Sequence, residues 1–276
     1  MKHLNSELLA HKNNLEQKRR RAEALSLEER GLVSMAVAAY EGYIRKIHAG
    51  EIAQCSLTNA VAALNEYLDV AKTLEAEHGL FNWRSDFASS VIPEFLYITI
   101  HTFLNGEGMT PFFSTKNSIV EVVLTSSAER TFEVRKKDQD FCMGFSKASF
   151  QTGPATETFI LPALVFEVKT NIDINKLNGL KFSAERLKRS FPHAKYFLVS
   201  ETIDFSLKDN YAAGSLDEVY VLRKQMRSAS RRAKGPLQAD VFEEILRDVL
   251  EIAKRSVAER GHVYSRLKSG KLINAK

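Results

Sequence analysis

The stretch from Phe159 to Thr170 constrains the fold most, because its apolar run FILPALVF leads into Glu-Val-Lys. Branched and aromatic residues over so short a length are typical of a buried strand that is covered on both faces. Pro162 then belongs at the start of the strand. Side chains alternate along a strand, so Glu167 and Lys169 share one face and lie about 6 to 7 Å apart. A carboxylate and an ammonium can therefore reach the same small site.

The composition is that of a globular protein, and its modest basic excess fits an anionic partner. The 276 residues suffice to bury a core, and 44% hydrophobic with 26% charged residues excludes a disordered chain. The net charge of +5 favours a negatively charged partner. Cys55 and Cys142 lack the paired spacing of a disulfide framework or a zinc site. We expect a cytoplasmic protein without a membrane span, because no apolar signal segment opens the chain and Pro93, Glu94 and His101 interrupt its most apolar stretch.

Helical spacing dominates the first 80 residues. Ser26 to Glu29 has the capping-box pattern that opens a helix, and Thr58 to Glu77 carries leucine and valine at helical intervals. We therefore expect residues 1–80 to form an all-helical region, which contacts DNA or a partner subunit or, as the alternative, simply packs on the core. The basic cluster Lys18 to Arg21 is interpreted either as a solvated helix face or as a phosphate-binding patch.

From residue 81 onward the pattern changes to mixed helices and strands. The expected helices are one with Pro93 and Glu94 in its first turn, one at 175–191 and one from 237 to about 260. The expected strands lie at 119–124, 131–136, 195–200 and 218–222. A polar connection at 146–158 is expected near the substrate groove. Strand, helix and strand after Lys169 predict a crossover between parallel strands.

A third charged position lies upstream of Glu-Val-Lys. Asp140 stands directly before an alternating apolar run that begins at Phe141. A carboxylate binds Mg²⁺ as a hard oxygen ligand, and a nearby lysine can hold or help deprotonate the water that attacks a phosphate. The pattern of Asp, a long gap and Glu-x-Lys resembles the PD-(D/E)XK nuclease family, which includes most type II restriction endonucleases.

This resemblance implies an α/β fold with a mixed-sheet nuclease core flanked by helices over residues 81–276. It also implies a Mg²⁺ site held by Asp140 and Glu167 and supported by Glu94, with Lys169 positioning the attacking water. Asp138 is the alternative ligand, and a tight turn made by Asp-Gln-Asp is the alternative explanation of both aspartates. Glu94 has an ordinary explanation as well, since the helix dipole favours glutamate in a first turn.

Residues 223–235 form a basic segment without an acidic residue. We expect it to contact double-stranded DNA, because arginine forks suit phosphates and guanine edges. Its six cations are Arg223, Lys224, Arg227, Arg231, Arg232 and Lys234. The resemblance is nearest to subunits of heterodimeric restriction enzymes, which implies a related second endonuclease subunit as partner, with a homo-oligomer as the alternative for the chain alone.

We expect a sequence-specific DNA endonuclease subunit that hydrolyses one strand per active site with Mg²⁺. Two other functions stay open at this point. A non-catalytic DNA-binding protein would use the same basic surfaces, and Glu167 and Lys169 would then be a surface ion pair worth at most about 1 kcal/mol. A DNA repair or recombination nuclease would share the fold but not the base-specific cleavage.

Overall fold

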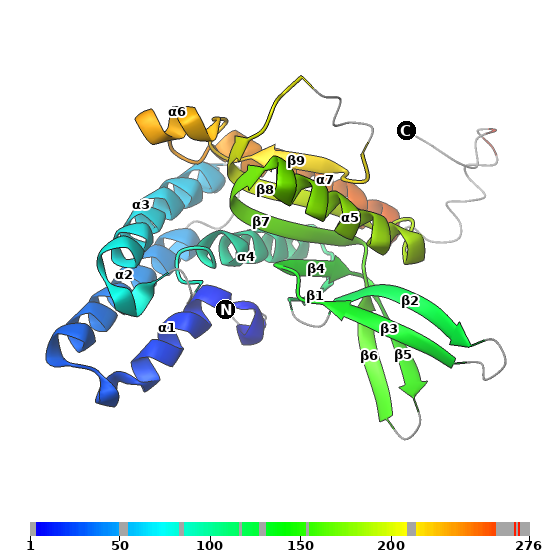
Figure 1. The fold of residues 1–276 in the computed structure, drawn as a ribbon, viewed down its shortest axis with the longest axis horizontal. Coiled ribbons are helices and arrows are strands. Elements are labelled where there is room, and N and C mark those ends of the chain that lie inside the picture. The colour runs from blue at the N-terminus through cyan, green and yellow to red at the C-terminus, as the bar shows by residue number, and fades with distance from the viewer. Residues whose placement is uncertain are drawn as a thin grey trace.

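The computed structural model describes residues 4–49, 55–82, 86–115, 118–126, 131–152, 155–208, 214–257, 268 and 270. A five-stranded sheet forms its centre, and the helices of the N-terminal region lie to one side of the sheet (Figure 1). Two strand hairpins extend from the other end of the sheet (Figure 1). None of the described helices is both long and apolar enough to cross a bilayer.

The N-terminal region is helical, as predicted. It contains the 3-10 helix η1 (Ser6–Leu8), α1 (Ala10–Arg20), η2 (Ala22–Ala24), α2 (Leu27–Ala49), α3 (Cys55–Glu77) and η3 (Gly79–Phe81), followed by α4 (Val91–Gly106). The predicted capping box is present at the start of α2. The Ser26 hydroxyl accepts a hydrogen bond from the N–H of Glu29 at 3.2 Å, and the Glu29 carboxylate accepts one from the N–H of Ser26 at 2.9 Å.

The central sheet is mixed. Its strands lie side by side in the order β1 (Phe112–Ser114), β4 (Phe141–Gly144), β7 (Leu164–Asp173), β8 (Lys195–Asp204) and β9 (Glu218–Val221). β1, β4 and β7 pair antiparallel, whereas β7, β8 and β9 pair parallel. α5 (Ile174–Ser190) connects β7 to β8, and its N-cap is Asp173, whose side chain accepts a hydrogen bond from the N–H of Lys176 at 2.9 Å. The predicted crossover between parallel strands is confirmed.

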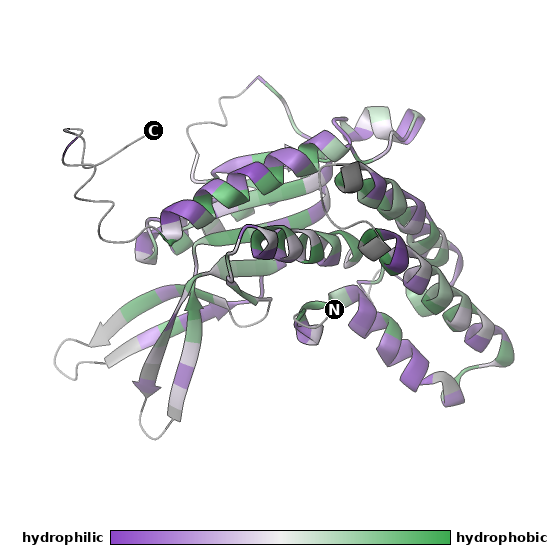
Figure 2. Ribbon diagram, turned by 180° about the vertical axis from the view of Figure 1, so that it is seen from behind, coloured by the Kyte–Doolittle hydropathy of each residue, from purple (hydrophilic) through white to green (hydrophobic). Residues whose placement is uncertain are grey.

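Helices cover both faces of the sheet. α5 packs on one face, where Val165 of β7 shares a core with Leu187. α4 and α7 (Ala239–Ser256) pack on the other face, where Phe166 of β7 shares a core with Phe95 and Phe242. Hydrophobic residues accordingly follow α4 and the central strands (Figure 2). The prediction that the strand before Glu167 is buried on both faces is confirmed.

The helical region and the sheet share one core. Leu15 of α1 and Leu64 of α3 are buried in the same cluster as Phe95 of α4 and Phe166 of β7. Burial of this kind contributes roughly 1.5 to 3 kcal/mol for each large apolar side chain. The position of the N-terminal helices relative to the sheet is therefore fixed by packing.

Two predictions about residues 146–170 are wrong. The expected single strand from 159 to 170 is two strands, β6 (Ala155–Leu161) and β7, because Pro162 lies between them and offers no N–H for a ladder. The expected polar connection is a hairpin of β5 (Ser146–Thr152) and β6. Polar side chains suit this hairpin, since the hydroxyls of Ser149 and Thr158 hydrogen-bond across it at 2.9 Å.

The second hairpin consists of β2 (Ser118–Ser126) and β3 (Thr131–Lys137), as predicted. The two hairpins contact each other, and Lys136 of β3 forms an ion pair with Glu157 of β6 at 2.6 Å. Gly144 permits the close passage of β4 beside β6. A β-carbon at this position would lie 2.0 Å from the backbone oxygen of Leu161, so a larger residue would push the strands apart.

Candidate active site

Asp140 lies beside the Glu-Val-Lys sequence of β7, because it directly precedes β4 and β4 pairs with β7. Its Oδ2 accepts a hydrogen bond from the backbone N–H of Val168 at 2.6 Å. The ammonium of Lys169 donates to the same oxygen at 3.3 Å and to Oε2 of Glu167 at 2.9 Å. The sheet thus brings Asp140, Glu167 and Lys169 together, with one ammonium between two carboxylates.

Glu167 is the more enclosed of the two carboxylates, with only 4% of its surface exposed. Its Oε1 accepts hydrogen bonds from Lys137 at 2.6 Å and from the hydroxyl of Tyr196 at 3.1 Å. Its Oε2 accepts the bond from Lys169. Two lysines therefore compensate this buried charge, which would cost several kcal/mol if it were left unpaired.

The pKa values follow from burial and from these lysines. Burial alone would raise the pKa of Glu167, but Lys169 and Lys137 outweigh it and hold the pKa below its usual value. Burial raises the pKa of Asp140, and the charge of Glu167 adds to the rise, against Lys169 and the hydrogen bond from the N–H of Val168. Burial would lower the pKa of Lys169, but the two carboxylates outweigh it and raise the pKa. Lys169 is therefore a charged donor at neutral pH.

The donor chemistry of the pair fits a divalent metal ion. Carboxylate oxygens are hard ligands, and Mg²⁺ in proteins is commonly bound by one or two carboxylates together with substrate oxygens and water. Asp140 and Glu167 already converge on one cationic group, the ammonium of Lys169. These two residues would hold the ion.

The structure does not bring Glu94 to this pair. Its carboxylate is buried among helices, where Oε1 accepts a hydrogen bond from the hydroxyl of Tyr40 at 2.6 Å and Oε2 accepts one from the N–H of Lys12 at 3.0 Å. Burial raises its pKa, against the hydrogen bond from Tyr40. No three acidic, histidine or cysteine side chains gather as a metal site among the described residues. The predicted trio of Asp140, Glu167 and Glu94 is therefore not formed, and Glu94 instead ties α1 and α2 to α4.

A cleft of about 1170 Å³ opens at Asp140 and Lys169. Its walls come from the segment before α4 and the first turn of α4, from α3, from the carboxyl-terminal halves of β7 and β8, and from the segment around α6 (Arg227–Arg232). Asp138 is exposed in the same cleft, so it stays the alternative ligand. The cations along the cleft are Lys72, Lys169, Lys176, Arg223, Arg227, Arg231 and Lys234.

The six cations of the basic segment differ in their surroundings. Arg223 is buried, and its guanidinium donates to the carboxylate of Glu201 at 2.7 and 2.9 Å and to the backbone oxygen of Gly235. Lys224 forms an ion pair with Asp240 outside the described cleft lining. These two cations are occupied by the protein itself, which the prediction of six DNA contacts did not anticipate.

The other four cations are more accessible. Arg227 and Lys234 line the cleft while pairing with exposed carboxylates, at 3.3 Å for Asp204 and 2.5 Å for Asp69. Arg231 lines the cleft with no ion-pair partner among the described residues. Arg232 is exposed and is not part of the described lining. Ion pairs of this exposed kind contribute little, so a phosphate can displace them.

Sequence reasoning missed a buried carboxylate on β8. Glu201 is 3% exposed and accepts hydrogen bonds from Lys72 of α3 at 2.5 and 2.6 Å, in addition to those from Arg223. This ion triad joins the helical region to the sheet along the cleft. The only available signal is an acidic residue directly after the apolar run that ends at Ser200.

Lys137 and Tyr196 were missed as partners of Glu167. Lys137 is the last residue of β3, and Tyr196 of β8 lies opposite Val165 of β7 in the parallel ladder. The sequence contains two adjacent lysines at 136 and 137, and alternation alone does not reveal which one points toward β7.

A mixed sheet that presents Asp140, Glu167 and Lys169 beside a basic cleft defines the class of the protein as a nuclease with the PD-(D/E)XK core. Residues 86–235 match the family model of the Bpu10I restriction endonuclease, and the chain belongs to this family. The predicted fold class and the predicted resemblance to type II restriction endonucleases are confirmed.

Among solved structures, the chain is similar to the one described as native BbvCI A2B2 tetramer at low resolution. The two chains are 40% identical over 92% of this chain and 97% of that chain, with a TM-score of 0.67. No curated protein matches the chain. The chain is a sequence-specific DNA endonuclease subunit of the restriction type.

Proposed function

We propose that this subunit hydrolyses one strand of double-stranded DNA with Mg²⁺ bound by Asp140 and Glu167. The observation that carries the proposal is the single ammonium of Lys169, which lies between these two carboxylates where the basic cleft opens. Bound Mg²⁺ would neutralise charge on the phosphate and lower the pKa of water. The family as a whole implies a divalent metal, and the choice of Mg²⁺ is part of the proposal.

Lys169 holds the attacking water in this proposal. Because its pKa is raised, the residue is a charged hydrogen-bond donor rather than a base. Its side chain is 35% exposed and lines the cleft, so the ammonium can contact a water molecule there while both carboxylates fix its position. Fixed charge aimed at the reacting oxygens is the kind of interaction that stabilises a transition state most.

Cations of the cleft bind the DNA backbone. Arg227, Arg231, Lys234 and Lys176 line the cleft and are held at most by weak ion pairs or by a backbone oxygen. Phosphate contacts of this kind fix the register of a protein on the duplex without reading its sequence. Arg223 and Lys224 are left out of this set because their partners are Glu201 and Asp240.

A related second subunit completes the enzyme. BbvCI is described as an A2B2 tetramer, which contains two kinds of chain, and this chain is 40% identical to a chain of that structure. We propose that each kind of chain cuts one strand, and that the helical region 1–80 contacts DNA or the partner. A homo-oligomer is the alternative when the chain is alone.

The test is cleavage of supercoiled DNA of diverse sequence by the chain together with its partner subunit in Mg²⁺. Discrete fragments that disappear on adding EDTA are the expected result. Lys169→Ala in this chain alone is expected to leave a strand-specific nickase, since the partner's site stays intact. Lys254→Ala, an exposed lysine of α7, is the matched control and is expected to cut both strands.

Two results would contradict the proposal. Continued double-strand cleavage by the Lys169→Ala complex would show that another group performs the chemistry. DNA binding that survives EDTA, with no cleavage in any divalent metal, would favour the non-catalytic DNA-binding protein.

A further inference from the structure

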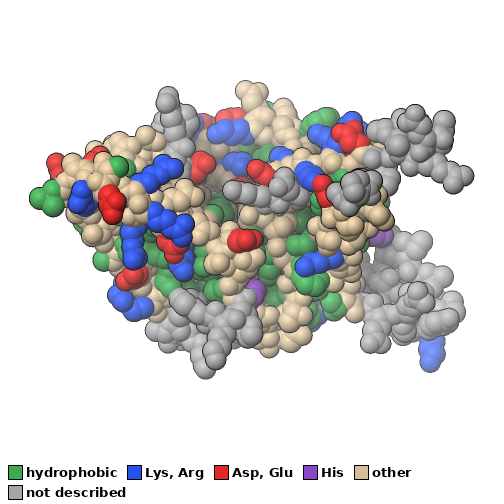
Figure 3. All heavy atoms as spheres, turned by 90° about the horizontal axis from the view of Figure 1, so that it is seen from below, with side chains coloured by type: hydrophobic (Ala, Val, Ile, Leu, Met, Phe, Trp, Pro, Cys, Tyr) green, Lys and Arg blue, Asp and Glu red, His purple; other side chains and the backbone are tan. Residues whose placement is uncertain are grey.

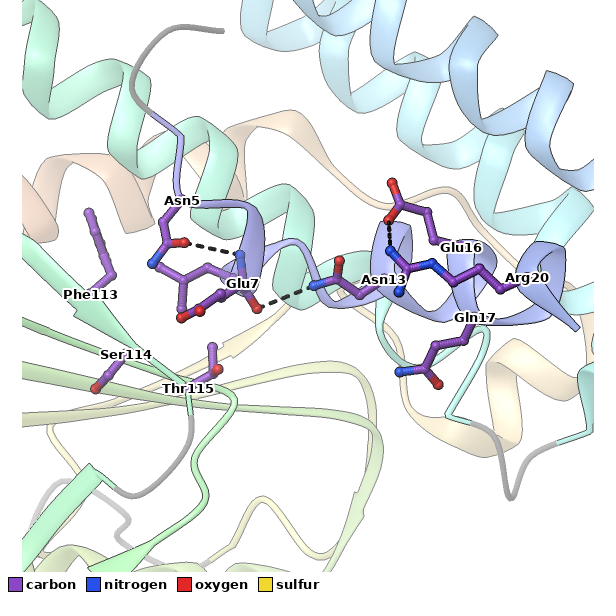
Figure 4. Close-up of a pocket in the computed structure, with 10 residues that line it drawn as sticks. Asn5, Glu7, Asn13, Glu16, Gln17, Arg20, Phe113, Ser114 and Thr115 are labelled. Carbon is purple, nitrogen blue, oxygen red and sulfur yellow. Dashed lines mark hydrogen bonds and ion pairs between the residues drawn. The ribbon is translucent and has the colours of Figure 1, made fainter.

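A second cavity lies next to the catalytic cleft, between α1 and the end of β1. Its volume is about 470 Å³, and its walls include Gln17 and Arg20 of α1 and Thr115 after β1 (Figure 4). Thr115 also lines the catalytic cleft, and its backbone oxygen accepts a hydrogen bond from the N–H of Gln139 at 3.1 Å. Gln139 directly precedes Asp140. DNA in the cleft would therefore reach this cavity within a short distance of the cut.

The lining of this cavity differs chemically from that of the cleft. The cleft lining contains seven cations and five acidic residues, whereas the cavity lining combines amide side chains with two carboxylates and one guanidinium, so cations outnumber acids in the cleft and acids outnumber cations in the cavity. The carboxylates of Glu7 and Glu16 would repel a phosphate backbone. Amides, arginine and glutamate are also the groups that hydrogen-bond to adenine, guanine and cytosine edges, respectively. The cavity therefore suits base edges better than phosphates.

Two of the lining side chains are available for such bonds. Gln17 is exposed, and its side chain points away from α1 on the side where Ser114 and Thr115 lie (Figure 4). It has no side-chain hydrogen bond among the described residues. Arg20 is 81% exposed, and its only ion pair within the described part of the chain is a long contact of 3.9 Å with Glu16. Such an exposed pair is worth little and is easily exchanged for another partner.

The remaining amides hold the helix in place. Asn13 donates to the backbone oxygen of Ser6 at 2.9 Å, and Asn5 accepts a hydrogen bond from the N–H of Glu7 at 3.0 Å. On its other side, α1 buries Leu15, and Lys18 donates to the backbone oxygen of Leu80 at 2.8 Å. Gln17 and Arg20 thus extend from a rigid helix, as precise recognition requires.

We infer that α1 is a sequence-reading helix, in which Gln17 and Arg20 contact base edges of the target DNA close to the cut. This inference deepens the proposed function, because it rests on DNA lying in the catalytic cleft. Positions 17 and 20 lie three residues apart and so share one face of the helix. On the side of the molecule where the N-terminal helices lie, basic side chains are interspersed with acidic ones (Figure 3).

The experiment selects DNA by binding, so that its readout does not depend on cleavage. The full chain carrying Lys169→Ala is mixed, alone and with its partner subunit, with duplexes that have a randomised central segment. Bound duplexes are sequenced. Gln17→Ala and Arg20→Ala are each expected to reduce the preference at one or two adjacent base pairs by at least about fivefold. The other positions of the selected motif are expected to stay unchanged.

Arg19→Ala is the matched control, because Arg19 is a neighbouring exposed arginine of α1 outside the described cavity lining. It is expected to leave the selected motif intact. An unchanged motif in both test variants, or an equal loss of affinity for all sequences, would overturn the inference. So would the absence of any selected motif in the parent protein. A failure of the unsubstituted complex to cut DNA would instead count against the proposed function and leave this readout intact.

Discussion

The ammonium of Lys137 lies 2.6 Å from Oε1 of Glu167, the carboxylate oxygen that Lys169 does not contact. Lys137 comes from the end of β3, outside the central sheet, and also lies 3.4 Å from the hydroxyl of Ser183 on α5. The orientation of the candidate metal ligand is therefore fixed from two sides, by one lysine of its own strand and by one from a hairpin.

Lys137→Met is expected to lower the single-turnover cleavage rate about 10- to 100-fold, because residues that orient a metal ligand typically have effects of this size. The loss is expected to be partly restored at higher Mg²⁺ concentration, which a general defect in folding would not show. Lys136→Met is the control, since its ion pair with Glu157 lies between the hairpins. Equal rates for the two variants would contradict an orienting role of Lys137.

Glu94 and Glu167 are expected to respond differently to the same substitution. Glu94→Gln replaces an acceptor of two buried hydrogen bonds with a group that can accept fewer, so the free energy of unfolding is expected to fall by about 1 to 3 kcal/mol. Cleavage by the folded fraction is expected to stay close to that of the parent. Glu167→Gln is expected to reduce the rate by about 100-fold or more, because a neutral amide is a weaker ligand for Mg²⁺ than a carboxylate.

Denaturant unfolding and single-turnover cleavage, measured on the same two preparations, check this pair. Loss of cleavage by Glu94→Gln without loss of stability would restore Glu94 as a member of the metal site.

Two arginines of the basic segment are expected to have different effects. Arg223→Ala leaves Glu201 buried without one of its two cations, which is expected to cost about 3 to 5 kcal/mol of stability. Arg231→Ala is expected to leave stability unchanged and to reduce the salt dependence of DNA binding by about one counterion. Binding titrations at several salt concentrations, together with thermal unfolding, distinguish the two. The opposite assignment of effects would show that Arg223 contacts DNA.

His11 predicts an acid-sensitive stability of the helical region. Its ring is buried, with Nδ1 donating to the backbone oxygen of Phe87 at 2.9 Å and Nε2 accepting from the hydroxyl of Tyr67 at 2.6 Å. Burial lowers its pKa from 6.5 to about 3, against the hydrogen bond to Phe87. The unfolded chain therefore binds a proton below pH 6.5 that the folded chain does not bind until about pH 3.

Stability is consequently expected to fall with decreasing pH between these values, by up to about 1.4 kcal/mol per pH unit from this group. The comparison is the pH dependence of urea unfolding for the parent and for His11→Asn, which is expected to lack this component. His193→Asn, at an exposed position, is the control. The same slope in the parent and in His11→Asn would exclude His11 as the cause.

The sequence was sufficient to predict the elements whose environment is set by their own periodicity. The strand that carries Glu167 and Lys169, the crossover through α5 and the helix with Pro93 in its first turn were predicted from their local apolar patterns, although the start of the strand was not. Asp140 could also be placed, because it directly precedes an apolar strand that must join the same sheet. These local patterns fixed the centre of the candidate site.

Relationships between distant segments were not predictable in the same way. Glu94 was expected at the metal site because it begins the correct helix, yet α1 and α2 cover that position and provide Lys12 and Tyr40 as its partners. Arg223 was expected to contact DNA because its neighbours in the sequence are basic, yet its guanidinium is buried in an ion pair with Glu201 of β8. In both cases a residue from another part of the chain determines the role, and spacing along the sequence does not contain that information.

The ion triad of Lys72, Glu201 and Arg223 has a consequence for how such chains can diverge. One buried carboxylate is shared by cations from α3 and from the segment after β9, so a change at one position leaves a charge without compensation at the other two. We therefore expect the residues at positions 72, 201 and 223 to be substituted together among related subunits. A related chain without an acidic residue at position 201 is therefore expected to lack the cations at positions 72 and 223 as well. The residues that contact DNA can vary independently of this triad.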